Sequence, residues 1–154
     1  MKCLPLLVIA TSMLVTGCAS VNMAPKEDST KAKQFALPTG NNAGLYVYRN
    51  SFFGKALKKD IWIDDKCLGE SASDVFFYTQ VEGGKSIKVS TESEFSANDL
   101  MVQVDSGKNY FVRRYIKIGA LVGGAGVELM SEQQGKTDIA QLEMAQPGHC
   151  SATK

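Results

Sequence analysis

The sequence has little of what enzymes and metal sites depend on. Its 154 residues include one histidine, His149, and four cysteines, with no C-x-x-C pair. A Ser-His-Asp or Cys-His site needs a histidine held in place by neighbouring groups, and His149 lies in a polar stretch near the end of the sequence. A zinc site made of Cys67, His149 and Cys150 would lack the paired spacing of zinc motifs. We therefore expect no enzymatic activity, no metal and no other cofactor.

Charge of one sign is not in excess either. Lysine and arginine together number 17 against 16 acidic residues. Without a basic field nothing attracts nucleic acid, so we expect no nucleic-acid partner. The acids Asp60, Asp64 and Asp65 cluster where a tight hairpin is predicted. Aspartate is favoured there for backbone reasons, so we interpret them as turn residues rather than calcium ligands.

The sequence contains one long apolar run, near its start, and no other. It covers residues 4–15 behind Lys2 and has the length of the apolar region of a signal peptide. The stretch VTGC at its end matches the lipobox of bacterial lipoproteins. The pattern predicts a signal peptide of residues 1–17 and a lipid on Cys18, which would attach the chain to a membrane. Ala19, in place of Asp, favours the outer membrane facing the periplasm. The alternative is an ordinary secretory signal.

Two further cysteines, Cys67 and Cys150, would then lie in an oxidising compartment. There they most simply form a disulfide, which would tie a C-terminal tail of residues 146–154 to the domain. The alternative is a reactive thiol pair, since Lys66 adjoins one cysteine and His149 the other.

The segment 18–43, which starts at the lipidated cysteine, contains few apolar residues and predicts a flexible tether. Pro25 and the acids after it are typical of a helix start, so a short helix toward Phe35 is also predicted.

From Gly44 onward the apolar residues alternate with a period of two, which is typical of strands with one buried face. Turn signals rich in Asp and Gly separate them. We predict a mainly all-β domain over residues 44–145, an antiparallel β-sandwich with short N-terminal and C-terminal helical segments. Ser131 is expected to cap a short helix, and residues 138–144 to form a last helix or strand. The predicted strands are 44–49, 60–64, 75–81, 85–91, 99–105, 109–118 and 127–131.

Two surfaces are candidates for interaction. The glycine-rich stretch IGALVGGAGVEL is either a plain hairpin between strands or a mobile apolar tip that touches lipid or a protein. Three aromatic residues alternate with apolar neighbours and form either an exposed recognition stripe or a face covered by the helix that begins near Pro25. Arg113 and Arg114, just before the glycines, must point to opposite faces, so at least one is exposed or paired. The candidate residues are Gly119, Leu121, Val122, Gly124, Tyr46, Tyr48 and Trp62.

Several stretches resemble a bacterial lipoprotein family that carries domain of unknown function 2846. They are GLYVYRNSFFGKALK, IWIDDKCLGE, VFFYTQVEGGKSIKVSTESEF, VDSGKNYFVRRYIK and SEQQGK, between residues 44 and 136. The family's hairpins are typically Asp-Gly-Lys and Pro-Gly-Lys-His, and this chain departs slightly at both. The resemblance implies a β-sandwich behind a lipid anchor and implies no activity.

These observations favour a lipid-anchored periplasmic lipoprotein that acts as a non-enzymatic protein-interaction or envelope-structural module. Its expected partners are the membrane, through the lipid, and an envelope protein. The main alternative is a β-sandwich that binds a small ligand or glycan, and a thiol or metal enzyme comes after it.

Overall fold

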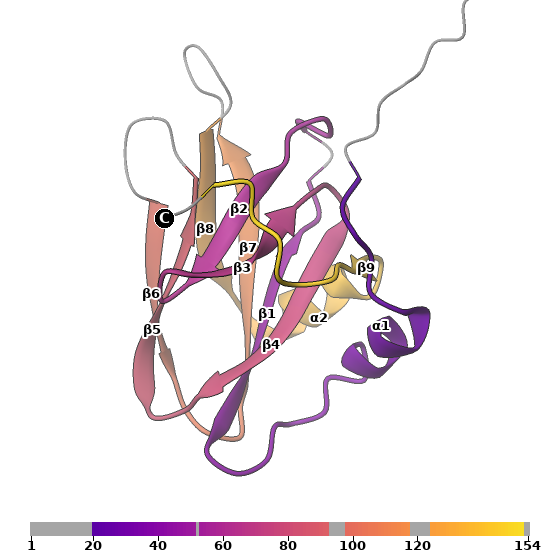
Figure 1. Cartoon of the computed structure of the whole chain (residues 1–154). Coiled ribbons are helices and arrows are strands. Elements are labelled where there is room, and N and C mark those ends of the chain that lie inside the picture. Colours follow the sequence, from indigo (N-terminus) through magenta and orange to yellow (C-terminus); the bar gives the residue numbers. More distant parts are fainter. Residues whose placement is uncertain (1–19, 52, 93–97, 118–123, 153–154) are drawn as a thin grey trace, which may run out of the picture.

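The computed structural model describes residues 20–51, 53–92, 98–117 and 124–152 (Figure 1). This part of the chain forms two helices and a set of strands that divide between two sheets. The elements are α1 (Lys26–Ala32), β1 (Asn42–Arg49), β2 (Lys59–Ile63), β3 (Lys66–Ser71), β4 (Val75–Glu82), β5 (Lys85–Thr91), β6 (Asn98–Val104), β7 (Asn109–Lys117), β8 (Gly124–Met130), α2 (Glu132–Ile139) and β9 (Glu143–Met144).

The two sheets pack face to face, which confirms the predicted β-sandwich. One sheet has the order β8-β7-β1-β4-β9 and the other the order β3-β2-β5-β6. The other neighbouring strands pair antiparallel, but β1 pairs parallel with β7, and β4 with β9. The parallel pairs are possible because long stretches of chain separate their strands, which gives room for a crossover. The first sheet is therefore mixed rather than purely antiparallel.

The core between the sheets comes from one face of each strand. Strand β1 contributes Leu45 and Val47, and its neighbour β7 contributes Val112. From the other sheet, Ile61 and Val89 pack against them. Every residue of β1 after Asn42 is buried, because this strand lies between β7 and β4 and both of its faces are covered. A central strand of this kind carries apolar side chains on both faces.

The helices cover the outer face of the five-stranded sheet. Figure 1 shows both on the same side of that sheet, away from the four-stranded sheet. Ala32 of α1 and Ile139 of α2 join a second apolar cluster with Tyr46 and Phe111 of the sheet. Ser131 caps α2 as predicted, since its hydroxyl accepts a hydrogen bond from the backbone N–H of Gln134 at 3.3 Å.

The predicted tether is wrong for most of its length, because the chain from Val21 onward packs on the domain. Val21 lies against the inter-sheet core, and Met23 forms a β-bridge with Ala145. Helix α1 is then fixed to β9. The Ser29 hydroxyl donates to Glu143 at 2.9 Å and accepts from the backbone N–H of residue 144 at 3.1 Å. These contacts depend on residues more than a hundred positions apart, which no local pattern reveals.

The acidic hairpin turn is confirmed for Asp64 and Asp65, but the prediction is wrong for Asp60, which is fully buried within β2. Asp64 and Asp65 both adopt positive φ, at 48° and 64°, between the paired residues Ile63 and Lys66. Two central residues with positive φ are what a two-residue hairpin turn of the favoured type requires. The periodic pattern does not predict β3, which follows this turn, because its sequence KCLGES carries few apolar side chains. Neither helix in the described part of the chain is long and apolar enough to cross a membrane.

Candidate functional site

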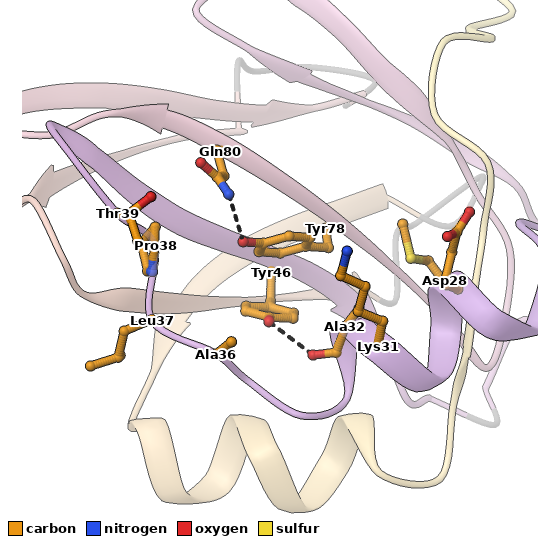
Figure 2. Close-up of a pocket in the computed structure, with 11 residues that line it drawn as sticks. Asp28, Lys31, Ala32, Ala36, Leu37, Pro38, Thr39, Tyr46, Tyr78 and Gln80 are labelled. Atoms are coloured by element: carbon orange, nitrogen blue, oxygen red, sulfur yellow. Dashed lines mark hydrogen bonds between the residues drawn. The ribbon is translucent and has the colours of Figure 1, made fainter.

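A groove of about 350 Å³ lies between the α1–β1 connection and the outer face of the five-stranded sheet (Figure 2). The connection contributes Leu37 and Pro38, and the sheet contributes Tyr46 and Tyr78. Leu37 is 64% exposed, so one wall of the groove presents an apolar side chain to solvent. Cavities with apolar walls and a few polar groups are the usual form of small-ligand sites.

Two tyrosine rings make the aromatic part of this groove. Their centroids are 4.6 Å apart with a tilt of 33° between the planes. Tyr46 is buried, and its hydroxyl donates to the carbonyl of Ala32 at 3.0 Å. Burial raises the pKa of Tyr46, so its phenol stays neutral. Tyr78 is half-buried, and its hydroxyl accepts from Gln80 at 3.4 Å. Tyr78 is thus the ring that a ligand can reach.

The polar residues of the groove lie around these rings. Asp28 and Lys31 of α1 flank it on one side, and Thr39 and Gln80 on another (Figure 2). An aromatic surface with hydroxyl, amide and charged groups beside it can stack against an apolar face and hydrogen-bond to its edges. The arrangement can accommodate a ligand that has an apolar face and polar substituents at its edge, such as a sugar ring.

The exposed aromatic stripe does not exist. Tyr46, Tyr48 and Trp62 are all buried, with exposed fractions of 1%, 0% and 5%. The alternative, a face covered by a helix, is correct for the two tyrosines, which lie under α1 and α2. The Tyr48 hydroxyl donates to Asp138 of α2 at 2.7 Å. Trp62 belongs to β2 in the other sheet, so the three rings share no surface.

Most of the glycine-rich candidate surface falls outside the described residues, including Gly119, Leu121 and Val122. Gly124 begins β8 and pairs with Lys117 at the end of β7. The two strands pair antiparallel from Phe111 opposite Met130 to Lys117 opposite Gly124, which agrees with a hairpin. Contact of this glycine-rich tip with lipid or a protein therefore stays a prediction. Cys18, the predicted lipidation site, also lies outside the described residues.

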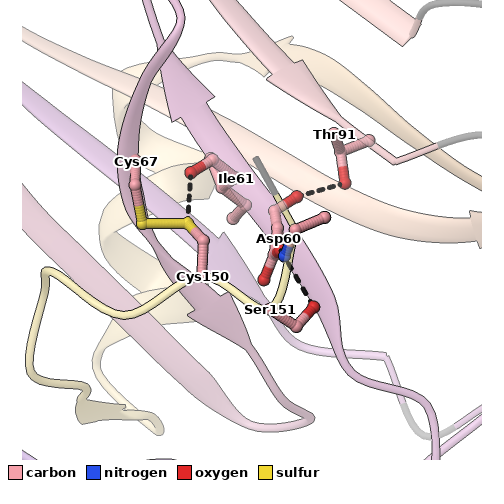
Figure 3. Close-up of a disulfide and its surroundings, with 7 residues drawn as sticks. Asp60, Ile61, Cys67, Thr91, Cys150 and Ser151 are labelled. Carbon is pink, nitrogen blue, oxygen red and sulfur yellow. Dashed lines mark hydrogen bonds between the residues drawn. A yellow bond between two sulfur atoms is a disulfide. The ribbon is translucent and has the colours of Figure 1, made fainter. Parts of the chain in front are cut away.

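The predicted disulfide is present between Cys67 of β3 and Cys150 (Figure 3). It fixes the C-terminal tail along β2 and β3, and the tail adds hydrogen bonds of its own. Gly148 donates its backbone N–H to Leu68 at 2.9 Å, and the carbonyl of His149 accepts from Glu70 at 2.7 Å. The tail is therefore an ordered part of the domain. Both thiols are used in the bond, which removes the free thiolates that a thiol or zinc site would need.

The end of the tail docks on a buried carboxylate. Asp60 is fully buried, and its Oδ2 accepts from the Ser151 hydroxyl at 3.0 Å and the Ala152 N–H at 2.8 Å. Figure 3 shows Asp60 between this tail and Thr91, whose hydroxyl donates to the Asp60 carbonyl at 2.9 Å. The His149 side chain is exposed. Among the residues that the structure describes, no three or more His, Cys, Asp or Glu side chains are grouped to hold a metal.

Two fully buried arginines form a feature that sequence reasoning missed. Arg113 and Arg114 point to opposite faces as expected, and Arg113 pairs with Glu128 at 2.7 Å. Arg114, however, is 0% exposed, and so is Arg49 at the end of β1. The signal was available. Both residues follow inward-facing valines at a spacing of two, Val47 before Arg49 and Val112 before Arg114, so both must enter the core.

Comparison with known proteins places the chain in a family. Residues 39–125 match the model of a family described as "Protein of unknown function (DUF2846)". The chain is also similar to an uncharacterized protein of Haemophilus influenzae, with 55% identity over 138 residues, which covers 90% of this chain and 82% of that protein. The family match spans most of the sandwich, from the α1–β1 connection to the start of β8. The chain therefore belongs to the DUF2846 family of proteins of unknown function.

Proposed function

We propose that this protein is a lipid-anchored lipoprotein of the bacterial envelope, held at the outer membrane on its periplasmic side, where its sandwich serves as a non-enzymatic interaction module. The lipobox ending at Cys18 supports the anchor. The disulfide between Cys67 and Cys150 agrees with an oxidising compartment outside the cytoplasm.

One observation carries the proposal further: the domain begins almost at the anchor. Val21, three positions after Cys18, already packs on the inter-sheet core. Three residues of extended chain span about 10 Å. A lipid on Cys18 would therefore hold the sandwich against the membrane surface instead of at the end of a long tether. The module would act on partners within reach of the bilayer.

The surface next to the anchor suits that position. Ser20 and Val21 line a small depression with Lys58 and His149, so the end of the 53–58 loop lies beside the first described residues of the chain. In this loop Phe53 is 58% exposed and Leu57 37% exposed. Exposed apolar side chains at this place suit a surface that rests in the membrane interface.

The anchor is tested by metabolic labelling with palmitate in the full-length protein and in its Cys18→Ala variant. We expect label in the wild type, recovered with outer-membrane fractions, and none in the variant. Unlabelled wild-type protein in the soluble periplasmic fraction would refute the anchor.

The partner is tested by photo-crosslinking in cells. A probe at Leu121 samples the glycine-rich tip, and a matched probe at Lys88 samples a polar strand position of the other sheet. We expect a discrete adduct from Leu121 alone, with a mass that identifies an envelope protein. No adduct at Leu121, or equal adducts at both positions, would count against the tip as the binding surface.

A second function, ligand or glycan binding, is favoured by the groove at Tyr78. It predicts saturable binding of soluble peptidoglycan fragments, measured by calorimetry, and a loss of at least tenfold in affinity for Tyr78→Ala. The matched control is Tyr115→Ala, because Tyr115 is a half-buried tyrosine on β7 that does not line the groove. Absence of any saturable heat, or an equal loss in both variants, would rule out this use of the groove.

A further inference from the structure

Arg114 occupies an unusual position for a charged side chain. It is fully buried, and its Nε, Nη1 and Nη2 atoms have no hydrogen-bond partner among the described residues. Its neighbour Arg113 is paired with an acid in the usual way, since its Nε donates a hydrogen bond to the Glu128 carboxylate at 2.8 Å. A buried polar group without a partner is destabilising, and a buried charge without a counter-charge more so. The side chain of Arg114 therefore needs an acceptor that the surrounding strands do not supply.

A second buried cation increases that need. Arg49 lies close enough to Arg114 to act on it electrostatically, and burial and Arg49 together lower the pKa of Arg114 to about 9. Arg114 is still a cation at neutral pH. Arg49 donates from Nη1 to the carbonyl of Leu57 and from Nη2 to those of Phe53 and Gly54, each at 2.7 Å. Carbonyls satisfy its hydrogen bonds but bring no negative charge.

The acidic groups that face this pair do not balance it. Glu92 attracts Arg114, but its carboxylate lies 3.3 Å from Lys59, with which it forms an ion pair. Asp74 attracts Arg49 electrostatically, but its side chain is exposed to solvent. Among the residues that the structure describes, Glu92 is thus divided between Arg114 and Lys59. In the described part of the chain no carboxylate hydrogen-bonds to either buried arginine.

We propose that Arg114, supported by Arg49, binds a small oxyanion, a phosphate or a carboxylate, between the two sheets. A guanidinium offers parallel N–H donors that match the paired oxygens of these groups. All three donor nitrogens of Arg114 are without a partner, and so is Nε of Arg49. The site is near the end of the sandwich, because Lys117, three residues farther along β7, is exposed. Three strand residues span about 10 Å.

The test is thermal unfolding of the folded protein at constant ionic strength, with inorganic phosphate or acetate replacing chloride. A ligand that binds only the folded state raises the melting temperature in a saturable way, by about 10 °C at a hundredfold excess over Kd for a chain of this size. We expect such a rise with one of the two anions in the wild type and none in Arg114→Met. Arg113→Met, which loses a half-exposed ion pair, should keep the full response.

Two further measurements complete the test. Arg114→Lys keeps the charge but not the paired donors, so it should retain a weaker response than the wild type. If Arg114→Met does not fold, ³¹P line broadening of phosphate with wild-type and Arg114→Lys protein gives the comparison. A wild type that responds to neither anion, or a response that persists unchanged in Arg114→Met or Arg114→Lys, overturns the proposal. Greater stability of Arg114→Met in chloride together with a lost anion response supports it, since the unpaired charge is then removed along with the site.

Discussion

Removal of the disulfide between Cys67 and Cys150 is expected to be among the most destabilising changes in this domain. The bond joins residues 83 positions apart, so it closes a loop that contains most of the sandwich. In the chain-entropy model a loop of this length restricts the unfolded chain by about 4.5 kcal/mol at 25 °C. Measured losses on removal of native disulfides are typically about 2–5 kcal/mol, so this figure lies near the upper end of that range.

The structure indicates which contacts would soften the loss. The tail also holds to the domain through the hydrogen bonds of Gly148, His149 and Ala152 with β2 and β3. A tail released from the disulfide can keep these contacts in the folded state, so the native structure should survive and the loss should appear mainly as lower stability. For a domain of this size, about 4 kcal/mol corresponds to a fall of roughly 15 °C in melting temperature.

The assay is urea unfolding followed by the fluorescence of the single tryptophan, Trp62, which is buried in β2 next to the tail. Wild type is compared with and without reductant, and with the double variant Cys67→Ser/Cys150→Ser. We expect reduced wild type and the double variant to lose similar amounts, and the double variant to ignore the reductant. A loss below about 1 kcal/mol, or a wild type whose midpoint is unchanged by full reduction, would refute the reasoning.

The remaining predictions concern the helices that cover the sheet. Gly135→Ala should destabilise by about 1–3 kcal/mol in urea unfolding, although alanine favours helix by up to about 1 kcal/mol, because the added Cβ would overlap the ring of Phe111. Tyr48→Phe should lose about 1–2 kcal/mol in the same assay, since it removes the hydrogen bond to the Asp138 carboxylate. Hydrogen bonds from α1 lower the pKa of Glu143 below its ordinary value of 4.5, so its contribution is present at neutral pH and is lost as the pH falls through that lowered pKa. Wild type and Glu143→Gln should therefore differ slightly at pH 7, and the difference should shrink as the pH is lowered below 4.5.

Each of these predictions has a control or a contrary result. Gln133→Ala, on the exposed side of α2, should be neutral or stabilising, and a similar gain for Gly135→Ala would show that Phe111 moves aside without cost. For Tyr48, the control is Tyr115→Phe, and equal effects would mean that the bond to α2 adds nothing. A gap between wild type and Glu143→Gln that widens in acid would contradict the direction of the pKa shift.

Most strands of this protein follow from local sequence patterns. Residues such as Leu45, Val47 and Ile61 alternate with the period of two that a half-buried strand imposes. The turn at Asp64 and Asp65 and the cap at Ser131 were also predictable, because backbone geometry and unpaired N–H groups restrict which residues fit there. The cysteine count was enough to predict the disulfide, since only two cysteines remain beyond the predicted lipidation site.

The tertiary structure decided which side chains reach solvent. Tyr46 and Tyr48 alternate like exposed residues, yet α1 and α2 bury them, and α2 begins 84 positions after Tyr48 in the chain. The same holds for the segment from Val21 to α1, which resembles a linker in composition but is fixed by contacts with Glu143 and Ala145. Long-range packing of this kind depends on how the sheets and helices assemble. The sequence by itself therefore determines where most strands and turns lie, while the groove at Tyr78 and the buried charge at Arg114 arise only when distant segments meet.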